Sequence, residues 1–144
     1  MWLYQNKPFT EDDIDNAFGF VYIITNLLSN RKYIGKKFFT KSGRKQVKGK
    51  KKKIRVKSDW VDYWGSNKTL QEEVKNAETE HFKREILHLC NTKSECAYLE
   101  TMEIFKHDAI ISDEYYNDWV SCKIRKEHLR SSSYLWKDTN TYNN

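Results

Sequence analysis

The chain has 144 residues, of which 32% are charged and 15% aromatic, with 5 Gly and 1 Pro. This length fits one domain with one hydrophobic core, and the composition excludes a disordered or low-complexity chain. No apolar run approaches the roughly 18 residues that cross a bilayer, and the N-terminus lacks the basic start and apolar block of a secretory signal, so we expect a cytoplasmic protein with no membrane partner.

The positive charge is concentrated in one segment. Residues 31–57 contain 14 Lys and Arg and no Asp or Glu, whereas the remainder has 12 basic and 20 acidic residues. Like charges at this density repel one another, and the repulsion falls when a polyanion such as a phosphate backbone replaces the counterions. The segment therefore favours a nucleic-acid partner over a solvated loop or a localisation patch, which would have a similar composition.

The sequence divides into three parts. An acidic N-terminal extension (1–17) precedes a single folded domain (18–130), which includes a basic insertion (38–66), and a polar tail (131–144) follows. The three cysteines lack the paired spacing of a zinc site, so we expect reduced thiols packed among apolar neighbours.

A β-hairpin is predicted near the start of the domain. Residues 20–24 and 32–37 are rich in β-branched and aromatic side chains, and the residues near 27–30 favour a turn. Residues 82–89 predict a third strand. The predicted fold is α/β, in the α+β sense: a small central three-stranded antiparallel sheet flanked by helices.

Three helices are predicted around this sheet. Residues 69–77 form a short amphipathic pattern, and residues 120–129 predict a last helix. Between them, Thr92 or Ser94 caps a helix. Its core-facing side chains are expected to be Ala97, Leu99, Ile104 and Phe105.

Tyrosines mark the predicted hairpin. Tyr22 and Tyr33 lie eleven positions apart on neighbouring strands, so both phenols can face the same side of the sheet. Gly35 allows close approach of another group, and Lys36 follows it directly. Further along, Tyr98-Leu99-Glu100 lies on a predicted helix, and Tyr116-Asn117 comes after it.

These elements, in this order, resemble the GIY-YIG nuclease family over about residues 18–120. Val21-Tyr22 and Tyr33-Ile34-Gly35 are similar to its paired signature, although Gly19 stands one place too early. Glu100 matches its metal-binding glutamate and Asn117 its closing asparagine. The family also expects an arginine about ten residues beyond the second tyrosine, which here falls in the basic insertion; Arg44 lies closest by count, and Arg55 is the alternative.

The resemblance implies a metal-dependent DNA endonuclease that leaves 5′-phosphate and 3′-hydroxyl ends. Glu100 would hold one Mg²⁺ or Mn²⁺, with Glu103 on the same helix as the rival ligand. Either tyrosine could accept the proton of the attacking water; we predict Tyr22, with Tyr33 positioning water or phosphate. The predicted catalytic residues are Tyr22, Tyr33, Lys36, Arg44, Glu100 and Asn117.

The basic insertion supplies the predicted DNA contacts. The aromatic cluster near the end of the insertion, Trp60, Tyr63 and Trp64, could stack on bases or could plug the base of the insertion against the core. The long insertion is similar to that of phage-encoded members of the family, including homing-type endonucleases. Specificity would come from the insertion, from a homodimer, or would be weak. The alternative is a catalytically inactive nucleic-acid-binding protein that uses the Lys-rich loop alone. The predicted DNA-binding residues are Lys37, Lys41, Lys48, Lys50, Lys51, Lys52, Lys53, Arg55, Lys57, Trp60 and Ser66.

Overall fold

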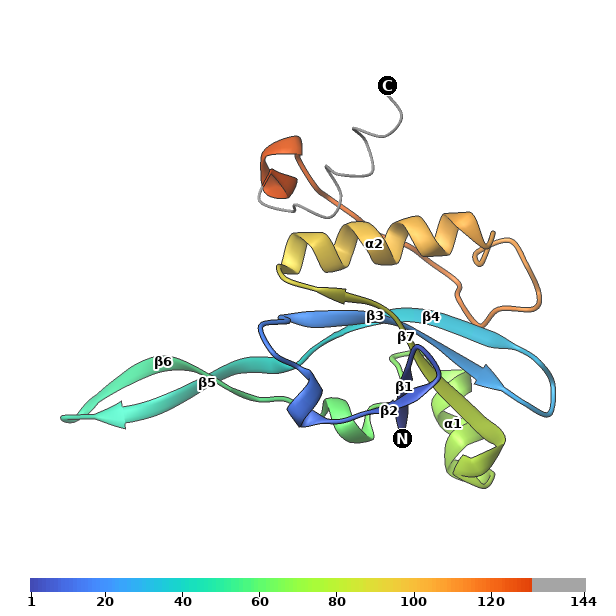
Figure 1. The fold of residues 1–144 in the computed structure, drawn as a ribbon, viewed down its shortest axis with the longest axis horizontal. Coiled ribbons are helices and arrows are strands. Elements are labelled where there is room, and N and C mark those ends of the chain that lie inside the picture. Colours follow the sequence, from blue (N-terminus) through green and yellow to red (C-terminus); the bar gives the residue numbers. More distant parts are fainter. Residues whose placement is uncertain (131–144) are drawn as a thin grey trace.

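The fold is organised around one strand, β3, which is buried on both faces. The computed structural model describes residues 1–130, and Figure 1 shows a twisted sheet with helices on either side. The strands are β1 (Trp2–Tyr4), β2 (Lys7–Phe9), β3 (Gly19–Asn26), β4 (Lys32–Phe38), β5 (Thr40–Val47), β6 (Lys50–Lys57) and β7 (Phe82–Cys90). The helices are α1 (Lys68–Asn76) and α2 (Lys93–Lys106), with single 3-10 turns η1 (Glu11–Asp13), η2 (Trp60–Asp62), η3 (Thr79–His81) and η4 (Lys126–Leu129).

The main sheet has five strands in the order β2-β1-β7-β3-β4, which corrects the expected three-stranded sheet. The expected strands are its antiparallel centre, β7-β3-β4. Residues 2–9, assigned to an extension by sequence, add β1 in parallel to β7 and β2 antiparallel to β1, so the sheet is mixed. Strands of three residues are too short to show an alternating pattern in the sequence.

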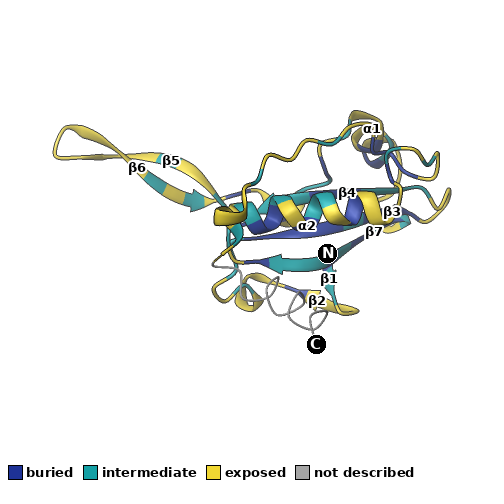
Figure 2. Ribbon diagram, turned by 90° about the horizontal axis from the view of Figure 1, so that it is seen from above, coloured by how far each residue is buried: buried dark blue, intermediate teal, exposed yellow. Residues whose placement is uncertain are grey.

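Each face of the sheet has its own hydrophobic core, because successive side chains of a strand point to opposite faces. Phe20, Tyr22 and Ile24 of β3 pack with α1 and η2, whereas Val21 packs under α2 with Leu99. Figure 2 shows the buried residues gathered along the sheet and the inner side of α2. α2 begins after Thr92, whose hydroxyl accepts from the Glu95 N–H at 3.1 Å, as the sequence predicts.

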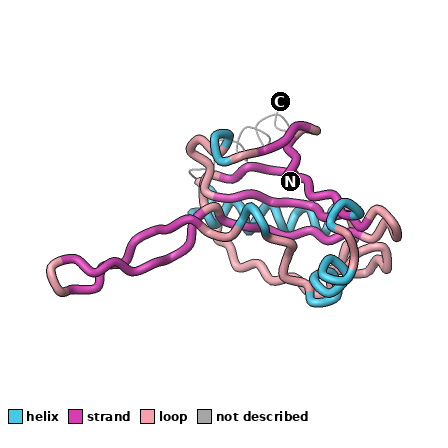
Figure 3. The backbone as a smooth tube through the Cα atoms, turned by 90° about the horizontal axis from the view of Figure 1, so that it is seen from below, coloured by secondary structure: helices cyan, strands magenta, loops and turns pink. Residues whose placement is uncertain are grey.

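The basic insertion forms a two-stranded antiparallel ribbon, β5–β6, and not the loop that its charge suggests. Lys48 and Gly49 both have positive φ angles, 50° and 77°, which is the geometry of a type I′ turn. The turn closes a register in which every residue from Thr40 to Val47 is paired with one on β6. Figures 1 and 3 show this ribbon extending away from the body of the molecule.

The two ends of the ribbon are fastened where they leave the body. The Ser58 N–H donates to the Phe39 carbonyl at 2.9 Å, and the Ser58 hydroxyl donates to the Phe38 carbonyl at 2.6 Å. Trp60 follows and is buried, with its ring 5.1 Å from that of Phe39. The carbonyl of Trp60 accepts from the indole N–H of Trp2 at 2.8 Å, which ties the ribbon's base to β1.

Two expectations near the C-terminus are wrong. Residues 120–125 are not helical and only Lys126–Leu129 form a single 3-10 turn, because Val120 packs against the α2 core from an extended segment. Phe105 is 61% exposed: it lies six residues after Leu99, which puts it on another side of α2. The polar tail (131–144) lies outside the described residues. Within residues 1–130, neither helix is long and apolar enough to cross a bilayer.

Candidate active site

The site is built on the outer edge of β4, the last strand of the main sheet. Along the first half of this edge, residues 114–117 run beside β4, and Lys32 exchanges backbone hydrogen bonds with them. A side chain then replaces backbone: the Asn117 amide accepts from the Ile34 N–H at 3.0 Å and donates to the Ile34 carbonyl at 2.8 Å. The chain leaves the strand after Asn117, and the next part of β4, at Lys36, lines a cavity.

Tyr22 reaches this edge because the residue opposite it is a glycine. Tyr22 is paired with Gly35 in the register of β3 and β4, and a Cβ at Gly35 would overlap the Tyr22 hydroxyl group. Tyr33 lies on the same face, with its ring centroid 6.2 Å from that of Tyr22. Its hydroxyl is 2.8 Å from that of Ser66, so the two phenols face the same side, as the hairpin predicts.

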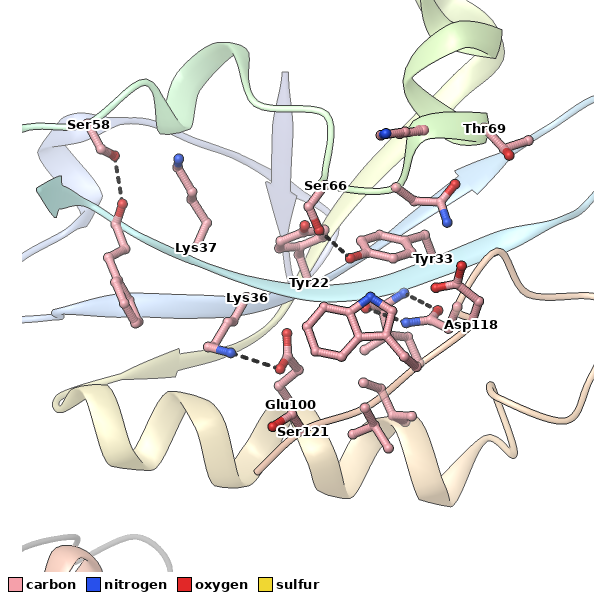
Figure 4. Close-up of a pocket in the computed structure, with 18 of the residues that line it drawn as sticks. Tyr22, Tyr33, Lys36, Lys37, Ser58, Ser66, Thr69, Glu100, Asp118 and Ser121 are labelled. Carbon is pink, nitrogen blue, oxygen red and sulfur yellow. Dashed lines mark hydrogen bonds and ion pairs between the residues drawn. The ribbon is translucent and has the colours of Figure 1, made fainter. Parts of the chain in front are cut away.

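Glu100 arrives from the opposite face of the sheet. It lies in the middle of α2, and its Oε1 accepts from the Lys36 ammonium at 3.0 Å. Lys36 points toward α2 because neighbours along a strand alternate sides. The site therefore straddles the edge strand, with phenols on one side and a carboxylate on the other, and Figure 4 shows these side chains around one cavity.

Glu103, the rival ligand, faces elsewhere. It is 5% exposed, and its carboxylate contacts His88 Nε2 at 2.8 Å and His107 Nδ1 at 3.3 Å. It does not line the cavity, whereas Glu100 does. Glu103, which contacts two histidines, and Glu100, which lines the cavity, are thus about one helical turn apart on α2.

The cavity has a volume of about 570 Å³ and combines acidic, phenolic and cationic groups. Its walls come from β3, β4, the ends of the ribbon, the start of α1, the middle of α2 and residues 117–121. The polar side chains that line it are Tyr22, Tyr33, Lys36, Lys37, Thr40, Lys41, Ser58, Ser66, Asn67, Lys68, Thr69, Glu100, Asn117, Asp118 and Ser121.

A comparison with protein families shows which family has this arrangement. Residues 2–120 match the family model SegE_GIY-YIG, described as "Putative endonuclease segE, GIY-YIG domain". The chain belongs to the GIY-YIG endonuclease family. No curated protein and no solved structure matches it. The match begins at Trp2, so β1 and β2 lie within the matched GIY-YIG domain.

The two phenols of the GIY-YIG site differ in environment. Burial raises the pKa of Tyr22 well above its usual value, and the neighbouring Tyr33, Tyr63 and Glu100 raise it further. Burial also raises the pKa of Tyr33, although its hydrogen bond with Ser66 acts in the opposite direction. Both are therefore neutral phenols at pH 7, and Tyr22 needs added positive charge nearby to become a phenolate.

The donor set of the GIY-YIG site fits one hard cation. The ammonium group of Lys36 already stands 3.0 Å from Glu100 Oε1, which shows that a positive charge is accommodated at this point. Asp118 is the other carboxylate on the cavity wall. Because Mg²⁺ keeps several waters and needs few protein ligands, a single glutamate with waters and substrate oxygens can hold it.

The cations of the site are lysines. Among the described residues no arginine lines the cavity, whereas Lys36, Lys37, Lys41 and Lys68 do. Arg44, the predicted arginine, lies on the outer part of the ribbon opposite Lys53, so the structure does not bring it to the site. The placement of Arg44 by counting fails because the insertion forms a ribbon directed away from the body.

Arg55, the alternative, lies at the base of the ribbon. Its guanidinium donates to the Thr40 carbonyl at 2.8 Å and to the Thr40 hydroxyl at 3.0 Å. Thr40 lines the cavity, but Arg55 itself does not. Its contacts hold the first pair of the ribbon in place.

Lys37 and Tyr63 form a second polar group beside the phenols. Lys37 Nζ lies 4.0 Å from the centre of the Tyr63 ring and 2.7 Å from Asp59 Oδ1, and this hydrogen bond lowers the pKa of Asp59. Tyr63 in turn stands edge-on to Tyr22, with ring centroids 6.1 Å apart. Sequence reasoning did not identify Tyr63, because the aromatic cluster alone does not show which of its rings is turned toward β3.

Trp60 and Trp119 lie in opposite environments. Trp60, predicted to contact DNA, is 2% exposed and plugs the base of the ribbon, so its ring is not available for stacking on bases. Trp119 is 72% exposed and lines the cavity two residues after Asn117. The one feature of the sequence that could have placed Trp119 at the site is its position close to the Tyr116-Asn117 pair.

Proposed function

We propose that the chain is a metal-dependent endonuclease that hydrolyses DNA phosphodiester bonds to leave 5′-phosphate and 3′-hydroxyl ends. The observation that carries the proposal is the meeting of Glu100, Tyr22, Tyr33 and Lys36 around one cavity across the edge of β4. Family membership supports endonuclease activity in general, and these residues supply its chemistry.

Glu100 is the proposed ligand of one Mg²⁺ or Mn²⁺. Such an ion would polarise the scissile phosphate and stabilise the charge that develops on it. Lys36 pairs with the Glu100 carboxylate in this structure. With a cation held by Glu100, the Lys36 ammonium would be available to a phosphate in the cavity that these two side chains line.

Tyr22 is the proposed general base. Its hydroxyl lies over Gly35 at the strand edge, and its side chain lines the cavity. A neutral phenol is a poor base, so the proposed role requires positive charge close to the oxygen, which the bound cation and Lys36 would supply. Tyr33, held by Ser66, positions water or phosphate, and Asn117 fixes β4 in place.

Lysines take the part that the family resemblance assigns to an arginine. Lys37 and Lys41 line the cavity on the ribbon side and Lys68 lines it at the start of α1. Point charges on both sides of a bound phosphate stabilise the pentacovalent transition state. The basic ribbon extends this positive surface and is proposed to contact the DNA backbone. A phage or homing setting and a homodimer belong to the proposal on the strength of the resemblance alone.

Nicking of supercoiled plasmid tests the proposal. The wild-type chain should cut with Mg²⁺ or Mn²⁺ and not with EDTA, and Glu100→Gln should abolish cutting. Glu72→Gln, which changes an exposed carboxylate of α1 outside the cavity, is the matched control and should cut normally. Equal cutting by the wild type and Glu100→Gln would refute the assignment of Glu100.

The alternative function is nucleic-acid binding without catalysis. The ribbon would support it equally well, because phosphate contacts need no carboxylate. Salt-sensitive retention of the plasmid with no cutting under any metal condition would favour this alternative. The Glu100 variant would then bind like the wild type.

A further inference from the structure

The ribbon β5–β6 stands apart from the hydrophobic core. Along Thr40–Lys57 no side chain is fully buried, and only its base contacts the rest of the described chain, through Phe39 and Ser58, Arg55 over Phe18, and the Lys57–Glu11 ion pair. Figure 2 shows the outer half of both strands coloured as exposed. A hairpin without a core is marginally stable by itself, so a partner that binds the ribbon would also stabilise it.

Like charges crowd the ribbon. It carries ten Lys and Arg and no Asp or Glu. The pairing register sets Arg44 opposite Lys53 and Lys45 opposite Lys52, so like charges face each other across the strands. Such pairs destabilise a ribbon, and binding a polyanion between or beside them removes the repulsion.

Protection of strand edges does not account for this density of charge. A few lysines on an exposed edge are enough to prevent edge-to-edge aggregation. Here the cations occupy both faces, because successive residues of a strand alternate: Lys50 and Lys52 point to one side and Lys51 and Lys53 to the other. A structure that is positive on both faces fits between two rows of phosphates.

We propose that the ribbon lies in the major groove of B-form duplex DNA whose backbone passes through the cavity. The major groove, about 12 Å wide, admits a two-stranded ribbon, whereas the minor groove of about 6 Å does not. The deep, narrow major groove of duplex RNA excludes it as well, and a single strand has no groove. Eight residues per strand give the ribbon a length of about 26 Å, roughly three-quarters of one helical turn of the duplex.

The base of the ribbon connects this groove to the site. Thr40, Lys41 and Ser58 belong to the ribbon or its fastening and also line the cavity. A duplex that touches the cavity therefore meets the ribbon directly beside it. Arginine hydrogen-bonds to guanine edges and glutamine to adenine edges in the major groove. Arg44 and Gln46, on the outer part of β5, are therefore the proposed base-reading residues.

This inference deepens the proposed function by naming its substrate, and it is tested by binding in EDTA, where no cutting is needed. The probes are a short DNA duplex, its single strand, and an RNA duplex of the same sequence. The variant changes Lys50, Lys51, Lys52 and Lys53 to glutamine. The control changes four exposed lysines of the body to glutamine, at Lys7, Lys75, Lys93 and Lys123.

The ribbon variant should bind the DNA duplex about 10- to 100-fold more weakly at about 0.15 M salt. The slope of its affinity against salt should fall by about 0.9 for each phosphate that the ribbon no longer neutralises. Its binding to single strand and to duplex RNA should weaken several-fold less, and the control should bind every probe nearly as well as the wild type. Equal weakening on the three nucleic acids, or equal weakening of variant and control, would show a charge tether only and overturn groove binding.

Chemical protection gives a second, independent reading. Dimethyl sulfate methylates guanine N7 in the major groove and adenine N3 in the minor groove. The wild-type chain should protect a run of guanine N7 positions, and replacing residues 43–54 by Asn-Gly should remove that protection. Bound wild-type protein that leaves guanine N7 exposed would refute the proposal, even if the shortened variant fails to fold.

Discussion

Single residues at the edge of β4 decide whether the site exists. Gly35 leaves space for the Tyr22 hydroxyl, and Asn117 ends the pairing along the strand so that the cavity opens beyond it. Neither residue carries the reaction, yet each fixes the position of groups that do. The geometry of this site therefore depends on the absence of a side chain at Gly35 and on the Asn117 amide, which takes the hydrogen-bonding place of a neighbouring backbone.

Asn117→Ala should lower the free energy of unfolding by about 2–4 kcal/mol, because it leaves the buried N–H and carbonyl of Ile34 without partners. The free energy of unfolding of Asn117→Asp should lie between those of the wild type and Asn117→Ala, since a carboxylate accepts from the Ile34 N–H but cannot donate to the Ile34 carbonyl. Urea unfolding measures both. An alanine variant as stable as the wild type would show that water hydrogen-bonds to the N–H and carbonyl of Ile34 as well as the Asn117 amide does.

Alkaline pH should destabilise the fold through Tyr22. Its pKa is raised by burial above the ordinary value of 10, so the folded state disfavours the phenolate. The free energy of unfolding is then unaffected by this residue below pH 10. It falls by about 1.4 kcal/mol per pH unit as pH rises from there toward the raised pKa of Tyr22.

Urea unfolding of the wild type and Tyr22→Phe between pH 9 and 11 isolates this effect, because other raised phenols titrate in both proteins. The Phe variant should lose less stability over this range. Identical pH dependence in the two proteins would mean that the Tyr22 phenolate is solvated in the folded state.

At the scale of elements, the ribbon and its base are one unit. Trp60 fills the space beneath the point where the two strands leave the body, between Phe9, Phe20 and Phe39. Its carbonyl also receives the Trp2 indole N–H. The segment that follows is held by Arg84, which donates to the Val61 and Tyr63 carbonyls at 3.0 and 2.8 Å.

Trp60→Ala should cost about 3–5 kcal/mol of stability, the usual range for removing a large buried ring. Trp119→Ala, at an exposed position, should leave the unfolding midpoint nearly unchanged. Thermal unfolding of both variants and the wild type measures the difference in their unfolding midpoints. A stable Trp60 variant that binds DNA poorly would return this residue to the stacking role expected from the sequence.

The central elements could be predicted because their patterns are long. β3, β4, β7 and α1 begin and end within a residue or two of the expected positions, and α2 begins directly after the expected cap, Thr92. β1 and β2 pair through three residues each, so no local pattern marks them. The ribbon could not be predicted, because its lysines hide the alternation of Ile54 and Val56 and its turn uses Lys-Gly rather than Asn-Gly.

The site could be predicted where motif and geometry coincide. Tyr22, Tyr33, Lys36 and Glu100 meet because the hairpin register and the helix position follow from local sequence. Arg44 and Trp60 could not be placed, since their positions depend on the path of an insertion and on the packing at its base. Tyr63 and Trp119 depend on the same long-range contacts.

At the scale of the whole molecule, charge is separated in space. The ribbon is positive along its length, while the chain outside residues 31–57 has 20 acidic against 12 basic residues. This acidic excess disfavours a phosphate backbone on average, whereas the ribbon and the lysine-lined cavity attract one. The net charge of +6 is therefore a poor guide to how this protein meets a polyanion.

Two variants of equal net charge should behave differently on a cation exchanger at pH 7. Changing Lys50–Lys53 to glutamine and changing four exposed body lysines to glutamine each lower the net charge from +6 to +2. The ribbon variant should elute at clearly lower salt, because it loses the concentrated patch. Elution of both variants at the same salt would show that net charge, not its placement, governs adsorption.

The fastening at Phe39 and Ser58 has one more consequence. The two chain ends that enter the ribbon are a single hydrogen bond apart, so the eighteen residues between them join the body as a closed loop. The entropic penalty of such a loop changes only slowly with its length. Ribbons of other lengths and sequences, or a small foreign domain, could therefore be grafted in place of residues 43–54 to redirect cutting, while the edge of β4 and the cavity-lining Thr40 and Lys41 stay as they are.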